Sequence, residues 1–238
     1  STLKMKTSDT PIVKDLVLVG GGHSHVTVLK RFGMKPLPGV RLTLICRDAH
    51  TPYSGMLPGF VAGHYGYDDA HIDLGALARF AGARFYHSTV TALDLTAKKV
   101  ICDDRPPVPF DLLSINTGST PNTDNVPGAT GNVVPVKPIN QFLDRWAALS
   151  DRAMATTDPL SIAVVGAGAG GVEIALAIQY RLRQQRAAAG RDDSDIAYHL
   201  FSNGSEILPT HNARVRKIFA DVLKKRGVQV HLGEAVVQ

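Results

Sequence analysis

Cysteine, tryptophan and long apolar runs are all scarce in this chain, and each shortage narrows the class of protein. The 238 residues include 2 cysteines, Cys46 and Cys102, too few for a disulfide framework and too far apart for a Cys-x-x-Cys redox pair. We therefore expect a reducing, cytoplasmic compartment. No apolar run approaches the roughly 20 residues that span a bilayer. We expect no secretory signal, because no apolar core follows the first residues, 1–6. A homodimer and a peripheral membrane association stay open.

The excess of positive charge is small and does not predict a nucleic-acid partner. The formal net charge is +5, and the densest basic stretches, 181–191 and 214–226, follow helical patterns whose other face is apolar. A solvated helix surface accounts for such stretches. The histidines His64, His71 and His87 match no recognised ligand spacing, so no metal site is predicted. With 44% hydrophobic and 20% charged residues, the chain has the composition of a globular protein of two ordinary domains.

Two glycine-rich segments each follow an apolar, β-branched run and open a helical pattern. The first reads GGGHSH at 20–25 and the second reads GAGAGG at 166–171. Such a turn lets backbone amides approach a pyrophosphate, and the helix N-terminus that follows favours its negative charge. One copy is a weak signal. Two copies in one chain suggest a protein that holds two dinucleotides.

The pattern around these turns predicts an α/β fold with two Rossmann-like dinucleotide-binding domains and parallel sheets. A second strand follows each turn and its helix, at 41–46 and at 196–201. The apolar stripe of the second helix ends near Gly190, and its arginines are expected on the solvated side. The predicted domains are 1–120, a linker at 121–138 and 139–238.

The remaining segments complete this outline. Short strands over 84–103 predict a small antiparallel meander, and another strand covers 110–115. The glycine- and proline-punctuated segment Tyr53–Gly59 is predicted to be a loop rather than a helix. Helices are expected at 139–152 and 212–226, the second followed by a strand at 228–232.

Three motifs in order make the chain similar to a known family: the turn at Gly20, the strand ending Ile115-Asn116-Thr117-Gly118, and the turn that leads to Glu173. The chain resembles the pyridine-nucleotide flavoprotein oxidoreductases, which include type II NADH dehydrogenases and disulfide reductases. The segments 20–26, 51–59 and 136–139 look like the flavoprotein domain often found N-terminal to selenophosphate synthase (selenide, water dikinase). Relatives of this design are longer, so the chain is expected to be truncated at its C-terminus.

The resemblance implies FAD at the first turn, NAD(P)H at the second, and hydride transfer between them. In that family Tyr53 and Pro58 would line the flavin, while Lys137 would stabilise charge on the reduced ring and Glu173 would lie near the nicotinamide. We count Lys137 and Glu173 as candidate catalytic residues, although a solvated lysine and a plain helix-start carboxylate explain them nearly as well. Glu173 is expected in the first turn of its helix. The full set of expected cofactor contacts is Gly20, Gly22, His23, His25, Arg47, Tyr53, Pro58, Thr117, Gly118, Gly166, Gly168, Gly171 and Ser202.

The chain departs from the family pattern at both turns. His25 occupies the place of the third glycine, so its ring must point aside or widen the packing; a phosphate contact and simple space-filling both stay open. The strands that usually end in a ribose-binding acid end at Cys46, with Arg47 and Asp48 behind it, and at Ser202. NADH and NADPH are therefore not distinguished.

The expected acceptor of the electrons is a quinone or a small oxidised selenium or sulfur compound, because a Cys-x-x-Cys pair is missing. The alternative is a nucleotide-binding module without turnover that regulates a partner such as selenophosphate synthase, fused or separate. The missing ribose acids and His25 favour this alternative.

Overall fold

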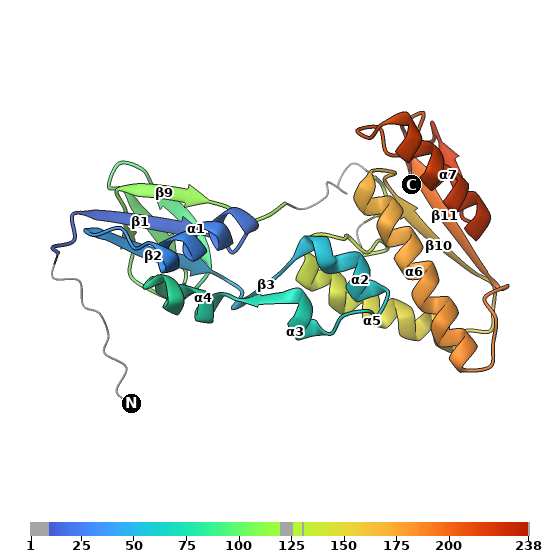
Figure 1. Ribbon diagram of the computed structural model, residues 1–238, viewed down its shortest axis with the longest axis horizontal. Coiled ribbons are helices and arrows are strands. Elements are labelled where there is room, and N and C mark those ends of the chain that lie inside the picture. The colour runs from blue at the N-terminus through green and yellow to red at the C-terminus, as the bar shows by residue number, and fades with distance from the viewer. Residues whose placement is uncertain (1–9, 120–125, 130, 238) are drawn as a thin grey trace. The chain divides into compact units, whose positions relative to one another are not determined.

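The computed structural model describes residues 10–119, 126–129 and 131–237, which divide into two compact units (Figure 1). Unit 1 comprises Ser1–Tyr53 and His71–Ser119, and unit 2 comprises Ser54–Ala70 and Thr120–Gln238. Residues 1–9 lie outside the described residues, and so do residues 121–125 and 130 of the predicted linker at 121–138.

Unit 1 is built on a parallel sheet of four strands in the order β5-β2-β1-β9. Its strands are β1 (Lys14–Val19), β2 (Val40–Cys46), β5 (Arg84–His87) and β9 (Leu112–Ile115), and its helices are α1 (His23–Met34) and α4 (Leu74–Ala81). Figure 1 shows both helices beside β1 and β2. The strand-turn-helix-strand order explains why the sheet is parallel. The helix carries the chain from the end of one strand back to the side of the sheet where the next strand begins.

Alternate residues of β1 enter two different cores, as expected of a strand buried on both faces. Leu18 packs with Leu29 of α1 on the helical side. Val17 packs with Val100 on the other side. That second face is covered by the predicted antiparallel meander of β6 (Val90–Asp94), β7 (Lys99–Cys102) and β8 (Val108–Pro109). A two-stranded ribbon, β3 (His50–Pro52) with β4 (His71–Asp73), completes the described strands of the unit.

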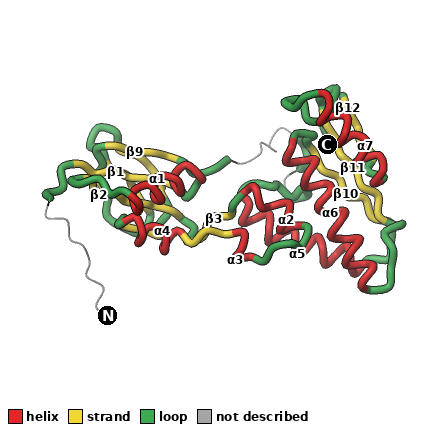
Figure 2. Tube along the Cα trace, in the orientation of Figure 1, coloured by secondary structure: helices red, strands yellow, loops and turns green. Residues whose placement is uncertain are grey.

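Unit 2 repeats the plan with a parallel sheet in the order β10-β11-β12. Its strands are β10 (Leu160–Val165), β11 (Ile196–Ser202) and β12 (Gln229–Leu232), and its longer helices are α5 (Ile139–Ala155), α6 (Ala169–Ala188) and α7 (Ala213–Arg226). Figure 2 shows α2, α5 and α6 grouped together, and their apolar side chains form one core with β10 and β11. The parallel Rossmann-like plan predicted for both halves is thus confirmed.

The prediction of a loop at 53–59 is wrong. A 3₁₀ turn, η1 (Ser54–Met56), leads into α2 (Leu57–Val61), and α3 (Tyr67–Ala70) follows. Pro58 is compatible with this helix because it lies in the first turn, where its missing N–H has no carbonyl to reach. Leu57 and Val61 are four residues apart and both are buried in the core of unit 2. Tertiary burial therefore outweighs the local turn signal.

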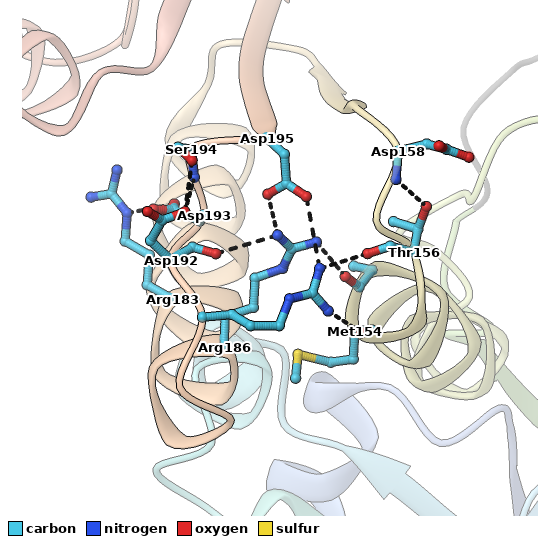
Figure 3. Close-up of polar contacts among 11 residues, drawn as sticks. Met154, Thr156, Asp158, Arg183, Arg186, Asp192, Asp193, Ser194 and Asp195 are labelled. Carbon is cyan, nitrogen blue, oxygen red and sulfur yellow. Dashed lines mark hydrogen bonds and ion pairs between the residues drawn. The ribbon is translucent and has the colours of Figure 1, made fainter.

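The arginines of α6 do not all face solvent as expected. Arg186 is 1% exposed. It pairs with Asp195 (Figure 3) and donates to the carbonyl oxygen of Ala153 at 2.7 Å. Arg191, which follows α6, donates to the carbonyl oxygens of Met154 and Thr156 at 2.8 and 2.7 Å. These guanidinium groups satisfy the carbonyls that the end of α5 leaves without helical partners.

Replacing Arg186 by Met should lower the free energy of unfolding of unit 2 by about 3 kcal/mol, because one partner of a buried, hydrogen-bonded pair is lost. Urea titration followed by the fluorescence of Trp146, the only tryptophan and part of this core, measures the effect. Arg183→Met is the control, since Arg183 pairs with Asp193 at the surface and its loss should cost less than about 1 kcal/mol. Equal losses in the two variants would contradict the role given to Arg186.

Candidate functional site: two glycine turns

Both glycine turns have the same backbone construction. Gly20 has φ +95° and donates its N–H to the carbonyl oxygen of Ile45 at 2.8 Å. Gly166 has φ +108° and donates to the carbonyl oxygen of Phe201 at 2.8 Å. Each turn is therefore tied to the end of the neighbouring parallel strand in a conformation that favours glycine.

The helices that follow these turns begin without a side-chain cap. The N-cap of α1 is Gly22 and that of α6 is Gly168; neither helix has an acidic residue in its first turn. By contrast, Asp73 caps α4 through the N–H of Ala76, and Asn212 caps α7 in the same way. The amides at the starts of α1 and α6 thus lack a side-chain acceptor, which makes them suited to a bound anion such as a pyrophosphate.

The first turn is held against the chain that leaves β9. Gly22 donates its N–H to the carbonyl oxygen of Asn116 at 3.2 Å. A Cβ atom on Gly20 would lie 2.2 Å from that oxygen, and one on Gly22 would lie 2.2 Å from the Asn116 Oδ1 atom. Sequence reasoning missed Asn116 as a site residue, although its place directly before Thr117 and Gly118 was a usable signal.

The second turn uses its glycines differently. A Cβ atom on Gly171 would lie 1.7 Å from the carbonyl oxygen of Gly166, so this glycine is required for the helix to pack on the turn. A Cβ atom on Gly168 or Gly170 would meet no atom within 4 Å. Gly168 therefore leaves open space at the uncapped start of α6, where a ligand backbone can approach closely.

His25 replaces the third glycine of the first turn by turning its ring into unit 1. Its side chain is 1% exposed. Nδ1 lies 2.7 Å from the carbonyl oxygen of Gly20, and Nε2 lies 2.8 Å from Oγ of Ser114. Burial lowers the pKa of His25, which favours the neutral ring. Both ring nitrogens contact protein atoms, so the geometry fits a residue that stabilises the turn. Ser114 takes part in the same contact, and the sequence did not reveal it.

The strand ends carry no ribose-binding acid. Cys46 ends β2, and its Sγ atom lies so close to Gly21 that a Cβ atom there would be 3.2 Å away. Burial raises the pKa of the Cys46 thiol. Arg47 is exposed and pairs with Asp48 at 3.4 Å. At the end of β11, Oγ of Ser202 accepts the N–H of Gly204 at 3.1 Å.

The other expected contacts of unit 1 gather at the same edge of its sheet. His23 is the first residue of α1, and the ring of Tyr53 packs edge-on against it with centroids 5.0 Å apart. Thr117 and Gly118 follow β9 and are exposed. Pro58, expected on the same loop as Tyr53, belongs to α2 and hence to unit 2.

The two candidate catalytic residues both belong to unit 2. Lys137 is exposed and lies just before α5. Glu173 is exposed on α6, but it lies one residue beyond the first turn, so the prediction that it lies in the first turn is wrong. The helix begins at Ala169, inside the glycine turn, so Glu173 falls in its second turn.

The two cysteines are free and lie on opposite faces of the sheet in unit 1. Cys46 packs with the core on the helical side, and Cys102 packs with the core beneath the meander. They therefore do not form a dithiol pair. Within residues 10–119, 126–129 and 131–237, no three His, Cys, Asp or Glu side chains converge as a metal site, and no helix is long and apolar enough to cross a bilayer.

Comparison with known proteins agrees with this construction. A sequence model of the family described as pyridine nucleotide-disulphide oxidoreductase matches residues 14–238. The NADH dehydrogenase-like protein YutJ of Bacillus subtilis (strain 168) is 30% identical over 223 residues, which cover 92% of this chain and 57% of that protein.

Solved structures show the same fold at low identity. NDH2 from Plasmodium falciparum, in complex with NADH, superposes with a TM-score of 0.80 at 19% identity, covering 92% of this chain and 48% of that one. The sulfide:quinone oxidoreductase of Aquifex aeolicus gives a TM-score of 0.74 at 17% identity, covering 93% and 51%. The chain thus spans less than two thirds of the length of these relatives.

Replacing His25 by Gln should flatten part of the pH dependence of stability. The pKa of His25 is lowered from 6.5, so below that pH the unfolded chain binds a proton that the folded chain rejects, and stability falls as pH falls towards the folded pKa. Urea titrations followed by circular dichroism between about pH 7.5 and 5 measure this slope. Ser24→Ala, an exposed neighbour on α1, removes no titratable group and should keep the wild-type slope. Identical slopes for wild type and His25→Gln would show that His25 does not titrate as proposed.

Proposed function

Because the chain belongs to the pyridine nucleotide-disulphide oxidoreductase family, we propose that it forms the cofactor-binding part of an FAD-dependent NAD(P)H dehydrogenase. The observation that carries the proposal is the pair of glycine turns, each followed by a helix whose first amides lack a side-chain cap. Two such anion sites in one chain suit two dinucleotides.

In unit 1, the amides at the start of α1 are proposed to bind the pyrophosphate of FAD, with Gly20 and Gly22 keeping the turn narrow. His25 acts behind the turn by fixing the carbonyl of Gly20. His23 with Tyr53, and Thr117 with Gly118, are exposed around the same edge and are proposed to contact the cofactor. When bound, FAD supplies a ring that accepts a hydride and releases the electrons to an acceptor.

In unit 2, the amides at the start of α6 are proposed to bind the pyrophosphate of NADH or NADPH. The open space at Gly168 supports this role. Ser202 is proposed to face the ribose, where its hydroxyl can replace the usual carboxylate in hydrogen bonding. Lys137 and Glu173 are exposed, and we keep them as candidates for positioning the reacting ring.

The acceptor is proposed to be a quinone or a small oxidised selenium or sulfur compound. The separation of Cys46 and Cys102 on opposite faces of a sheet argues against a dithiol relay to a protein disulfide. The similarity of 20–26, 51–59 and 136–139 to the domain that precedes selenophosphate synthase supports a selenium acceptor and that enzyme as a partner.

A second candidate is a nucleotide-binding module that does not turn over. It is favoured by the strand ends at Cys46 and Ser202, which lack the ribose-binding acid. Such a module would bind the nucleotides and signal to a partner protein. It differs from the dehydrogenase in one observable: whether bound flavin is reduced by the nicotinamide.

An anaerobic absorbance titration tests the proposal. The chain is mixed with FAD, freed of excess, and then given NADH or NADPH. Retained flavin absorption that bleaches with NADH or NADPH supports the dehydrogenase, whereas retained flavin that does not bleach supports the module. A chain that binds neither FAD nor nicotinamide nucleotide would contradict both.

Replacing Gly168 by Ala should weaken NADH binding at least about tenfold by blocking the approach of the pyrophosphate to the amides. The fold should survive, because Gly168 has φ −71° and its added Cβ meets no atom within 4 Å. Calorimetric titration with NADH compares the variant with the wild type, and equal affinities would remove Gly168 from the site.

A further inference from the structure

We propose that unit 2 carries a second ligand site, a cleft between α7 and β12 that binds an amphiphilic anion of the acyl-carboxylate class. Figure 2 places β12 beside α7, and between them lies a cavity of about 600 Å³. This volume is in the range of sites for small organic ligands. None of the residues that line the cleft belongs to either glycine turn, and Ser202 is not among them.

The walls of the cleft are mainly apolar. Arg216, Ala220 and Lys224 line it from α7, and their spacing of four residues places them in one row on the helix. The short side chain of Ala220 leaves room between the two cations. Val230 and Leu232 of β12 face them, and each is more than a third exposed despite its size. An apolar chain laid in the cleft would cover these side chains.

The cations at the rim differ in their partners. Arg216 pairs with Glu206 at 3.2 Å and donates to the carbonyl oxygen of His211 at 2.6 Å. Lys217 pairs with Asp221 at 2.9 Å. Lys224 has no carboxylate within 4 Å among the residues that the structure describes. Lys224 is therefore the cation that can take an anionic head group without breaking an existing pair.

The combination of wall and rim selects the ligand class. A small inorganic anion would leave the apolar wall in water, and a neutral apolar molecule would cover the wall without pairing with Lys224. A flat anionic membrane would meet the exposed lysines of α7 but does not enter a recess. A single molecule with a carboxylate at one end and an acyl chain behind it satisfies both parts of the cleft.

Titration with dodecanoate, below its micelle concentration, tests the proposal by calorimetry. We expect saturable 1:1 binding of dodecanoate and at least tenfold weaker binding of butanoate, which lacks the chain, and of dodecyltrimethylammonium, which lacks the acid. Lys224→Gln should weaken dodecanoate binding about tenfold, the loss of one charge-assisted contact. Lys225→Gln removes the same charge from the next residue, which does not line the cleft, and should leave the affinity unchanged.

A second variant tests the cavity itself. Ala220 is exposed, so Ala220→Leu should fill the cleft without changing the circular dichroism spectrum or melting temperature, and should abolish dodecanoate binding. Equal effects of Lys224→Gln and Lys225→Gln, or undiminished binding to Ala220→Leu, would overturn the proposal. Displacement of dodecanoate by NADPH would also overturn it, by making the cleft part of the nucleotide site. Binding to phosphatidylglycerol vesicles that survives Ala220→Leu, without binding of monomeric dodecanoate, would replace it with a membrane surface.

Discussion

The fold of each unit depends on one constraint: a glycine in a left-handed conformation must turn the chain while its amide stays bonded to the neighbouring strand. Gly20 meets this constraint against Ile45, and Gly166 meets it against Phe201. The turn then starts a helix whose first amides have no side-chain cap. The same geometry therefore closes a strand-helix crossover and prepares an anion site.

The two copies fill the crowded side of the turn in different ways. In unit 2, Gly171 lets the helix backbone lie against the carbonyl of Gly166. In unit 1, His25 bonds to the equivalent carbonyl of Gly20 and extends to Ser114 on β9. A polar bridge thus replaces close packing, and it ties the turn to a strand that is distant in sequence. Burial lowers the pKa of His25 and so favours its neutral form, which makes the bridge sensitive to acid.

Charge is distributed in unit 2 according to what each group contacts rather than where it falls in the sequence. Arg186 is buried because the carbonyls at the end of α5 and the carboxylate of Asp195 supply its partners. Lys224 is on another helix rich in basic residues, yet it borders a cleft and has no carboxylate partner among the residues that the structure describes. Two basic residues that look alike in sequence therefore differ in role.

The sequence by itself determined the parallel strands, the helices after both glycine turns and the meander, because hydrophobic period and glycine placement are local signals. It also assigned to the two turns their glycines, Gly20, Gly22, Gly166, Gly168 and Gly171. Tertiary structure alone decided that 57–61 is helical, that the ring of His25 is buried, and that Asn116 crowds the first turn. Each of these depends on residues far apart in the chain, whose contacts no local pattern records.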